Sequence, residues 1–518
     1  MTLRRTTVPL WIALLLVVGA GPIFGASFPP MNWWPCAFVG IAMVLVALRG
    51  RRIGTAFLVG FVAGESFYLI LVSWTGRYLG PVPWVALSTL EALLWGGGAV
   101  LIKLAYRYVP RAWPSVKGRI GLLPVLIASL WTLREFVTGS WPYGGFAWGR
   151  IAQSQSESPY SHLAAWVGVS GLSFVVVWIV ACTVELYFLT ELSRTIRLAI
   201  AIATITLTMT FPTWPTPTHG TFRVAAVQGN GPAGYFDDAP EGAVLETQVV
   251  ETLRVPTSPR VQLVVWPEGS ALPDPLTNSD TAALLDQLST RFRAPLLVGT
   301  ITSREGKYFN SSLQWEAGRG AVNQYDKKRP VPFGEYVPDR AFWRQFAPSL
   351  IDLIGRDYTP GTRGNVFTID GVHTGISICF DIVDDSLVQQ MMRGGAQVIV
   401  AQTNNADFGQ TDENVQQEAI ARLRAIETGR SLVNVSTVGV TAVIGPSGTT
   451  LMSIPAFRAG HLVADVPLGT TTTPLSLFGG GYEWLFSGVG LAGLLIAWRA
   501  RRSPDPEFGG SSPRWDAN

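Results

Sequence analysis

Long apolar segments follow one another through the first 211 residues, and one more lies near the C-terminus. The region between them has the mixed apolar and polar pattern of a globular domain. Apolar stretches of about 17 to 25 residues are long enough to cross a bilayer as helices. We place eight such spans, at residues 8–27, 33–48, 53–74, 84–106, 120–138, 162–189, 196–212 and 482–498.

The middle of the chain shows the pattern of β-strands interrupted by helices. Its β-rich runs alternate with helical patterns such as residues 279–292 and 414–428. This alternation is typical of a layered α/β domain in which helices cover a sheet. The expected strands are residues 221–228, 261–267, 294–302, 310–316, 372–380, 396–403, 431–437 and 439–445.

Basic residues at the ends of the spans predict the orientation of the chain. Cytoplasmic loops of membrane proteins carry an excess of Lys and Arg. With eight crossings every basic cluster falls on one side, so we expect that side to be the cytoplasm and residues 213–481 to lie outside it. The clusters are Arg4 and Arg5, then Arg49, Arg51 and Arg52, then Arg107, Arg111, Lys117 and Arg119, then Arg194 and Arg197, and finally Arg499, Arg501 and Arg502.

The expected organisation is membrane, exterior domain, membrane. A Pro-rich stretch after the seventh span cannot continue a helix and reads as a short, stiff linker. The predicted parts are a seven-span transmembrane domain (1–212), the linker (213–220), a globular domain (221–470), a return to the membrane with a C-terminal transmembrane helix (471–498) and a disordered cytoplasmic tail (499–518).

Composition supports this division. Of the 518 residues 48% are hydrophobic and only 14% are charged, which favours a membrane protein. The net charge of +3 is too small to indicate nucleic-acid binding.

Cys379 is the only cysteine in the polar half of the chain, at the end of the strand-like run 372–381. Cys36 and Cys182 lie in apolar segments. A cysteine without a partner in an oxidising exterior remains a thiol. Cys379 is therefore a candidate nucleophile, although a lone cysteine in a strand is more often a small buried hydrophobic residue.

Two other motifs offer the groups that such a nucleophile requires. A thiol needs a base, and the acyl-transfer transition state needs a cation or donor that faces the developing oxyanion. Glu268 can be the base and Lys327 the cation. His373 is an improbable base, because six residues of strand place it roughly 20 Å from Cys379. With four histidines and one exterior cysteine, no metal site is expected.

The motifs around these three residues resemble the nitrilase superfamily, whose members use a Glu-Lys-Cys triad in an α-β-β-α sandwich. With its membrane spans included, the chain resembles the apolipoprotein N-acyltransferase family over nearly its whole length. The segments that carry this closer resemblance are 141–149, 227–230 and 331–338. The resemblance implies a polytopic α-helical membrane domain plus an exoplasmic α/β domain with the nitrilase-like sandwich fold.

The resemblance assigns roles to individual residues. It implies Glu268 as general base, Lys327 as transition-state stabiliser and Cys379 as nucleophile. Lys327 is preferred to its neighbour Lys328, because the family's lysine stands eight residues before the Glu of the Pro-Phe-Gly-Glu run. That glutamate, Glu335, is the family's supporting carboxylate.

Two positions depart from the family pattern. Asp381, for which a supporting or positioning role is expected, stands where the family usually has Glu. Asp407 occupies the place of the Trp expected before Phe-Gly. Both Glu335 and Asp381 have the alternative of being simple ion-pair partners.

Substrate contacts are expected from three places. The residues are Tyr143 and Trp148 in an exterior loop, Asn404 and Phe408 after a strand, and Phe342 and Trp343 in the apolar segment 341–354, which we expect to be a mobile lid at the membrane interface. Interfacial anchoring is the alternative for the loop aromatics, and turn formation is the alternative for Asn404.

The resemblance implies that a fatty acyl chain passes from a membrane phospholipid, through a cysteine thioester, to the N-terminal amine of the diacylglyceryl-cysteine of an apolipoprotein. It implies no cofactor, a monomer, and a place in the bacterial inner membrane with both termini cytoplasmic. One alternative is a membrane-tethered amidase or nitrilase-type hydrolase, and another is an inactive receptor or scaffold. The apolar segment and the two-sided tether favour transfer, and the presence of all three residues speaks against lost activity.

Overall fold

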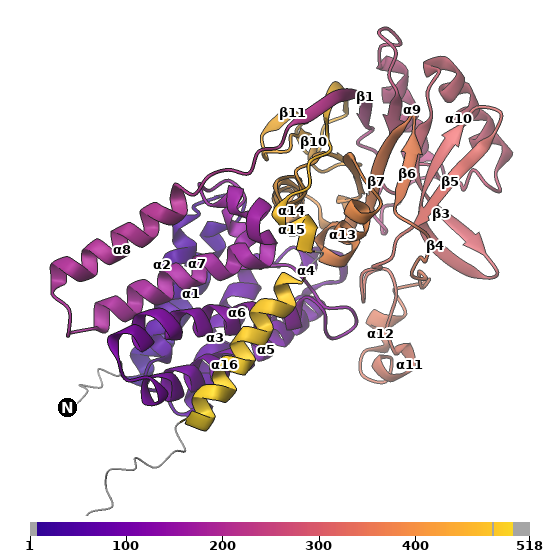
Figure 1. Ribbon diagram of the computed structural model, residues 1–518. Helices are drawn as coiled ribbons and strands as arrows, with labels where there is room; N and C mark the ends of the chain where they lie inside the picture. Colours follow the sequence, from indigo (N-terminus) through magenta and orange to yellow (C-terminus); the bar gives the residue numbers. More distant parts are fainter. Residues whose placement is uncertain (1–7, 479–480, 501–518) are drawn as a thin grey trace, which may run out of the picture.

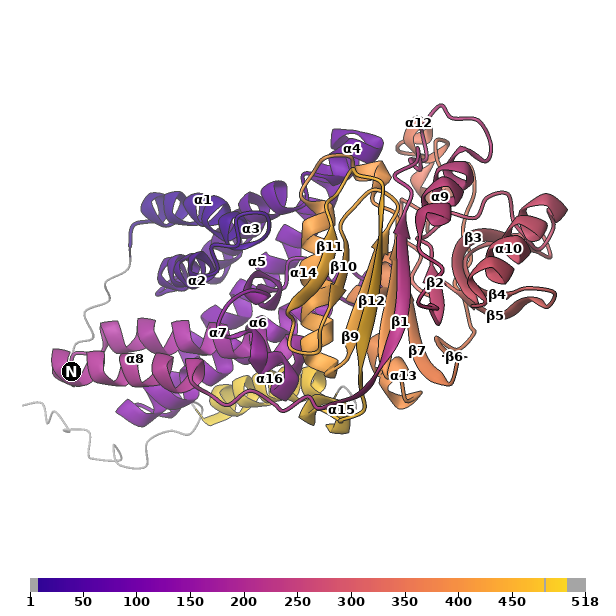
Figure 2. The ribbon, with the colours of Figure 1, turned by 90° about the horizontal axis from the view of Figure 1, so that it is seen from above.

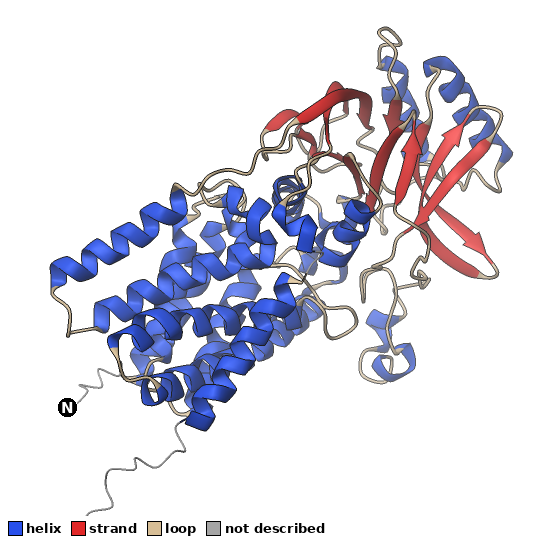
Figure 3. Cartoon of the chain, in the orientation of Figure 1, coloured by secondary structure: helices blue, strands red, loops and turns tan. Residues whose placement is uncertain are grey.

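The computed structural model describes residues 8–478 and 481–500, which form a helical bundle joined to a β-rich domain (Figures 1 and 3). Each of the eight segments expected to span a membrane contains a helix of this bundle. The eight helices are α1 (Leu10–Ser27), α2 (Pro35–Leu48), α3 (Ile53–Leu71), α5 (Pro81–Ala112), α6 (Leu123–Thr138), α7 (Ala164–Phe188), α8 (Arg194–Met209) and α16 (Tyr482–Ala500).

The bundle is long and apolar enough for a multi-pass membrane protein. Five helices of the described residues could cross a membrane by length and composition, and α2 is a shorter apolar helix. α16 returns from the far end of the sequence to pack against α5, α6 and α7. Eight crossings stay a prediction. The five candidate spans are Leu10–Ser27, Ile53–Leu71, Pro81–Ala112, Gly118–Thr138 and Ser161–Phe188.

Several basic loop residues gather at one end of the bundle. Arg51 donates to the carbonyl of Val8 (2.5 Å), and Arg49 pairs with Glu185 near the end of α7. Arg197 donates to the carbonyl of Tyr187 (2.8 Å). This end points away from the sheets (Figure 1). The expected cytoplasmic residues 1–7 and 501–518 lie outside the described residues.

The β-rich domain contains two six-stranded sheets, with strand orders β12-β1-β2-β3-β4-β5 and β11-β10-β9-β8-β7-β6. In each sheet three neighbouring strands run parallel, β1-β2-β3 in one and β7-β8-β9 in the other. The first sheet comprises β1 (Thr218–Gln228), β2 (Leu263–Val265), β3 (Leu296–Arg304), β4 (Lys307–Glu316), β5 (Gly320–Asp326) and β12 (Gly460–Gly469). The second comprises β6 (Val366–Ile369), β7 (Val372–Ile378), β8 (Val398–Thr403), β9 (Ser431–Ser436), β10 (Thr441–Ile444) and β11 (Thr450–Ile454).

Alternating side chains build the layers. In β8, Val398 and Val400 pack in the core between the sheets, whereas Ile399 and Ala401 face the opposite side. A strand buried on both faces is apolar at nearly every position, which explains its unbroken pattern in the sequence. The outer helices are α9 (Ala243–Arg254) and α10 (Ser279–Phe292) on the first sheet, and α13 (Asp385–Arg393) and α14 (Glu413–Thr428) on the second. The predicted α-β-β-α sandwich is confirmed.

Four strands were not expected from the sequence, namely β5, β6, β11 and β12. Their side chains are less uniformly apolar, and three consecutive residues of β11 are exposed. β1 also begins at Thr218, inside the expected linker, rather than at residue 221.

The bundle covers the outer helix layer of the second sheet. α14 lies between β9 and the membrane helix α7, as Figure 2 shows. The described residues also form four short α-helices, namely α4 (Thr75–Leu79), α11 (Arg340–Trp343), α12 (Pro348–Ile351) and α15 (Pro474–Phe478).

The orientation can be tested with two Lys→Cys variants in a chain whose native cysteines are replaced by Ala. We expect Lys307→Cys, at the exposed β3–β4 hairpin, to react with a membrane-impermeant maleimide in intact spheroplasts. Lys117→Cys, exposed at the basic end, should react only after permeabilisation. The reverse labelling pattern would contradict an exterior β-rich domain.

Candidate active site

The ends of three strands meet where the two sheets face each other. Glu268 follows β2, Lys327 follows β5 and Cys379 follows β7. Side chains of Gln402 and Tyr325 join the sheets at this edge. Gln402 Nε2 donates to the carbonyl of Trp266 (2.6 Å), and Tyr325 Oη donates to Asp381 Oδ2 (2.8 Å). Ligand sites of α/β proteins commonly lie at the carboxyl ends of parallel strands.

Lys327 is almost completely buried, with 2% of its surface exposed. Its Nζ lies 2.8 Å from Glu335 Oε2 and 3.2 Å from Glu268 Oε1. Its backbone N–H donates to the carbonyl of Asn310 on β4 (2.8 Å), which fixes the chain as it leaves β5. A buried ammonium is tolerated only with such compensating charges.

Asn310 holds the two carboxylates together. Its Nδ2 donates to Glu268 Oε1 (2.6 Å) and to Glu335 Oε1 (2.9 Å). This role of Asn310 was not predicted, because an asparagine in a predicted strand has no distinctive spacing. Val331 N also donates to Glu335 Oε2 (2.7 Å), so the second carboxylate is fully oriented.

Cys379 opens a tight turn (η4, Cys379–Val383) with φ of +47°, a left-handed conformation that non-glycine residues rarely adopt. The residue is half-buried, and its Sγ accepts a hydrogen bond from Gln417 Nε2 of α14 (3.7 Å). Strained backbone of this kind concentrates at functional sites, where surrounding contacts impose it.

The charges of the site shift the pKa values of its members. Burial raises the pKa of the Cys379 thiol well above its usual value, and Glu268 raises it further, whereas Lys327 opposes the shift. Burial disfavours the Lys327 ammonium, but the charges of Cys379, Glu268 and Glu335 outweigh it and raise its pKa. Burial also raises the pKa of Glu268. The thiol is thus protonated at neutral pH, with a basic carboxylate nearby.

A further carboxyl group, not singled out from the sequence, lies on the α14 side. Burial raises the pKa of Glu413 to about 8. Asn405 Nδ2 donates to Glu413 Oε2 (2.7 Å) and to Gln417 Oε1 (2.8 Å). The chain of contacts from Glu413 therefore reaches Cys379 through two amides.

Asp381 lies in the turn of Cys379 and is fully buried. Besides Tyr325 Oη, it accepts the backbone N–H of Arg329 (2.9 Å). Burial raises its pKa to about 6. The carboxylate thus ties the turn to the segment that follows Lys327.

Trp148 is buried against aromatic side chains of both domains. Its ring centroid lies 5.3 Å from that of Trp74, which in turn lies 4.8 Å from that of Phe408. The indole N–H groups of both tryptophans donate to Gln416 Oε1, at 2.8 Å for Trp148 and 3.2 Å for Trp74. The loop therefore docks the bundle on α14.

The aromatic row continues to the turn that carries Cys379. Phe146 stacks on Trp148 with centroids 6.1 Å apart and on Phe380 with centroids 6.0 Å apart. Phe380 directly follows Cys379. An apolar wall thus leads from the loop at Trp148 to Phe380, next to Cys379.

Tyr143 and Trp343 meet at a second aromatic group. Both rings pack on Phe333, with centroids 6.1 Å and 5.5 Å away, and Tyr143 Oη donates to Asp339 Oδ2 (3.0 Å). Phe342 projects outward and is 51% exposed. The structure thus brings the loop at Tyr143 against the segment 341–354, apart from the row at Trp148.

Asn404 and Asp407 hold neighbouring loops in place. Asn404 Nδ2 donates to the carbonyl of Ala233 (2.8 Å), and its Oδ1 accepts from Thr437 Oγ1 (2.6 Å). Asp407 Oδ1 accepts the backbone N–H of Tyr235 (2.6 Å). Both side chains therefore contact the backbone of the 230s loop.

Comparisons with known proteins agree with this architecture. Residues 20–182 match the apolipoprotein N-acyltransferase N-terminal domain family, and residues 223–473 match the carbon-nitrogen hydrolase family. An apolipoprotein N-acyltransferase of Mycolicibacterium smegmatis is 32% identical, over 93% of this chain and 85% of that protein. One from Azotobacter vinelandii is 28% identical over 96% and 97%, respectively. Among solved structures, an amidase from Nesterenkonia sp. is 17% identical, with 49% of this chain and 93% of that chain covered and a TM-score of 0.37.

The β-rich domain is thus a carbon-nitrogen hydrolase domain of the nitrilase superfamily. Joined to its helical bundle, it places the chain in the apolipoprotein N-acyltransferase family of membrane enzymes. The resemblance seen in the sequence is confirmed.

Asn310→Leu tests the carboxylate arrangement. The variant removes one hydrogen-bond donor from each of the two buried carboxylates, so we expect the free energy of unfolding to fall by about 1–3 kcal/mol and the activity to drop. Asn323→Leu is the control, since its amide donates to Gln314 in the same sheet (2.7 Å) away from Lys327. Equal denaturation curves and activities for the two variants would contradict the role of Asn310.

Proposed function

We propose that this protein transfers a fatty acyl chain from a membrane phospholipid to the N-terminal amine of the diacylglyceryl-cysteine of an apolipoprotein, through a thioester on Cys379. The observation that supports this most directly is Lys327, which is buried between Glu268 and Glu335 and interacts electrostatically with Cys379. The site belongs to a domain that packs on membrane helices, and both proposed substrates reside in the membrane.

In the first half-reaction Glu268 takes the thiol proton, and Sγ attacks the carbonyl carbon of the phospholipid ester. Lys327 stabilises the oxyanion of the tetrahedral intermediate. The bond between the carbonyl carbon and the glycerol oxygen breaks, and Glu268 returns the proton to that oxygen. The products are a Cys379 thioester and a lysophospholipid. The raised pKa of the thiol explains why a base is required.

In the second half-reaction the α-amine of the lipoprotein attacks the thioester. A C–N bond forms, the C–S bond breaks, and Glu268 carries the proton from nitrogen to the departing sulfur. Glu335 and Asp381 act as positioning groups, Glu335 on Lys327 and Asp381 on the turn of Cys379.

The segment 341–354 is suited to contact lipid. Ile351 and Ile354 are buried with Val337 and hold the segment on the domain. Phe342 and Phe346 remain 51% and 69% exposed. Exposed Phe side chains insert into a membrane interface, so we assign the segment as a lid at that interface.

Mass spectrometry of the purified protein after incubation with phospholipid tests the reaction. We expect a fatty acyl adduct on Cys379, discharged by a diacylated lipopeptide with a free amine. Glu268→Gln should form no adduct within the same time, because the thiol stays protonated. Cys36→Ser is the matched control and should behave as wild type. Discharge by water at the same rate as by the lipopeptide would instead indicate a hydrolase.

The lid can be tested with the pair Phe342→Ala and Phe346→Ala. Because both side chains are exposed, we expect the free energy of unfolding to change by no more than about 0.5 kcal/mol while transfer from phospholipid vesicles falls. Leu451→Ala, 46% exposed on β11, is the control. Normal activity in the double variant would show that the segment 341–354 has no role in the reaction.

A further inference from the structure

Arg424 of α14 is a buried guanidinium that contacts the turn of Cys379. Its side chain is 2% exposed. Nε donates to the carbonyl of Ile382 (2.9 Å), and Nη2 donates to the carbonyl of Val383 (2.7 Å). Both carbonyls belong to the turn Cys379–Val383. The rigid fork of a guanidinium suits this paired recognition, which a lysine ammonium cannot reproduce.

The turn is held at two points. Asp381, in the middle of the turn, accepts hydrogen bonds from Tyr325 Oη and from the backbone N–H of Arg329. Arg424 donates to the last two carbonyls of the turn. Cys379 at its start has the strained φ of +47°. Such a conformation persists only where neighbouring contacts determine it. The position of Sγ relative to Lys327 therefore depends on these contacts.

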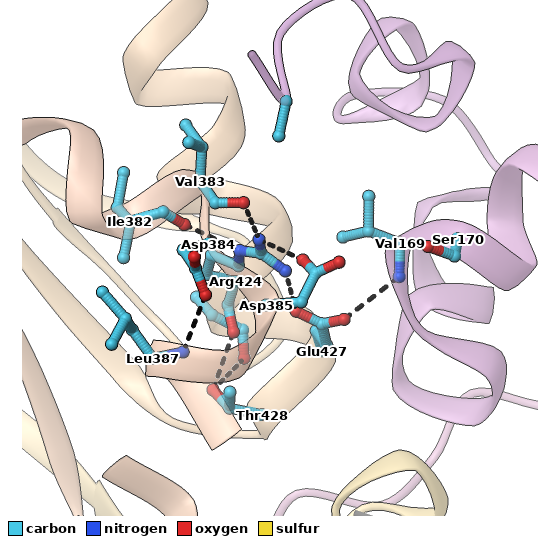
Figure 4. A network of polar contacts seen from close by, with 12 residues as sticks. Val169, Ser170, Ile382, Val383, Asp384, Asp385, Leu387, Arg424, Glu427 and Thr428 are labelled. Carbon is cyan, nitrogen blue, oxygen red and sulfur yellow. Dashed lines mark hydrogen bonds and ion pairs between the residues drawn. The ribbon is translucent and has the colours of Figure 1, made fainter. Parts of the chain in front are cut away.

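Arg424 is itself clamped by two carboxylates. Nη1 donates to Glu427 Oε2 (2.6 Å), and Nη2 pairs with Asp385 Oδ1 (Figure 4). Asp385 also accepts from Arg150 Nη1 of the membrane domain (2.6 Å). Burial would raise the pKa of Asp385, but Arg150 and Arg424 outweigh it and lower that pKa well below its usual value. Asp385 therefore stays ionised, whereas burial raises the pKa of Glu427 against the opposing charge of Arg424.

The membrane helix α7 completes the clamp. Gly168 breaks the helix with φ of +72°, and the freed N–H of Val169 donates to Glu427 Oε1 (3.1 Å). Figure 4 shows this bond crossing from the bundle to α14. A Cβ at Gly168 would lie 3.1 Å from the same Glu427 oxygen, so glycine keeps the approach open.

We propose that Arg424 is a positioning residue for the acyl transfer: it sets the turn that carries Cys379 and fastens that turn, through Asp385 and Glu427, to the membrane domain. The proposal rests on the proposed function, because it assigns Arg424 to the step in which Sγ attacks the phospholipid. The nucleophile then has its reactive geometry only in the chain with its bundle in place.

The test measures acyl-Cys379 formation per folded molecule of the full-length enzyme in micelles of phosphatidylethanolamine and detergent. For Arg424→Lys we expect the rate at saturating phospholipid to fall roughly 100-fold, as for a nucleophile displaced by about 1 Å, with KM for phospholipid unchanged. A merely structural role would lower the folded fraction but leave this rate intact. Arg422→Lys is the control, since Arg422, on the same helix, donates to the carbonyl of Gly448 (2.7 Å).

Each outcome decides the proposal. A folded Arg424→Lys enzyme with the wild-type rate, or with a raised KM alone, overturns it. If that variant does not fold, Asp385→Asn replaces it, because the guanidinium stays and loses one clamping charge; a lower rate at unchanged KM supports the proposal and a wild-type rate overturns it. Cys379→Ser separates the two claims. Acyl transfer by that variant would refute the proposed function, whereas a dead Cys379→Ser beside a normal Arg424→Lys refutes only the positioning role.

Discussion

The positive charge of Lys327, closed off from water, is the constraint on which the site depends. Removing an ammonium from water costs several kcal/mol unless nearby carboxylates compensate it. Glu268 and Glu335 do so, and Asn310 keeps both in place. The lysine follows β5, the asparagine lies on β4 and one carboxylate follows β2. Compensation is therefore complete only when the first sheet has formed in its native register.

The thiol belongs to the other sheet, so packing of the sandwich decides its distance from the charge. The apolar core between the sheets aligns them broadly. The bonds from Gln402 to Trp266 and from Tyr325 to Asp381 then pin the two edges at the site. Each is buried, and an unpaired partner there would cost about 1–3 kcal/mol. The polar contacts thus fix a geometry that apolar packing alone would leave loose.

Elements and residues were predicted best from the sequence where the pattern that defines them lies within a short segment. Residues 279–292 are a helix, as expected, because Asn278 caps its start by accepting the N–H of Thr281 and Arg293 ends it in the left-handed conformation. β5 was missed, since its apolar and polar residues do not alternate and only its last two residues, Tyr325 and Asp326, are buried. The candidate triad could be named because the motifs around it are distinctive. Asn310, Gln417 and Arg424 could not, because their partners lie far away in the sequence and amide or guanidinium groups carry no spacing signature.

The contacts of α14 connect the candidate active site to the membrane domain. The outer helices of a water-soluble sandwich keep one face in water, yet every residue of α14 is buried or half-buried. Its polar side chains must therefore find partners inside the protein. Gln416 accepts from the indole N–H groups of the bundle, Gln417 donates to Cys379 Sγ, and Glu427 accepts from the opened turn of α7. One helix therefore carries all three contacts and connects the bundle to Cys379. The helices that precede and follow the β-rich domain in the sequence thus hold the candidate active site in place as well as anchoring the domain.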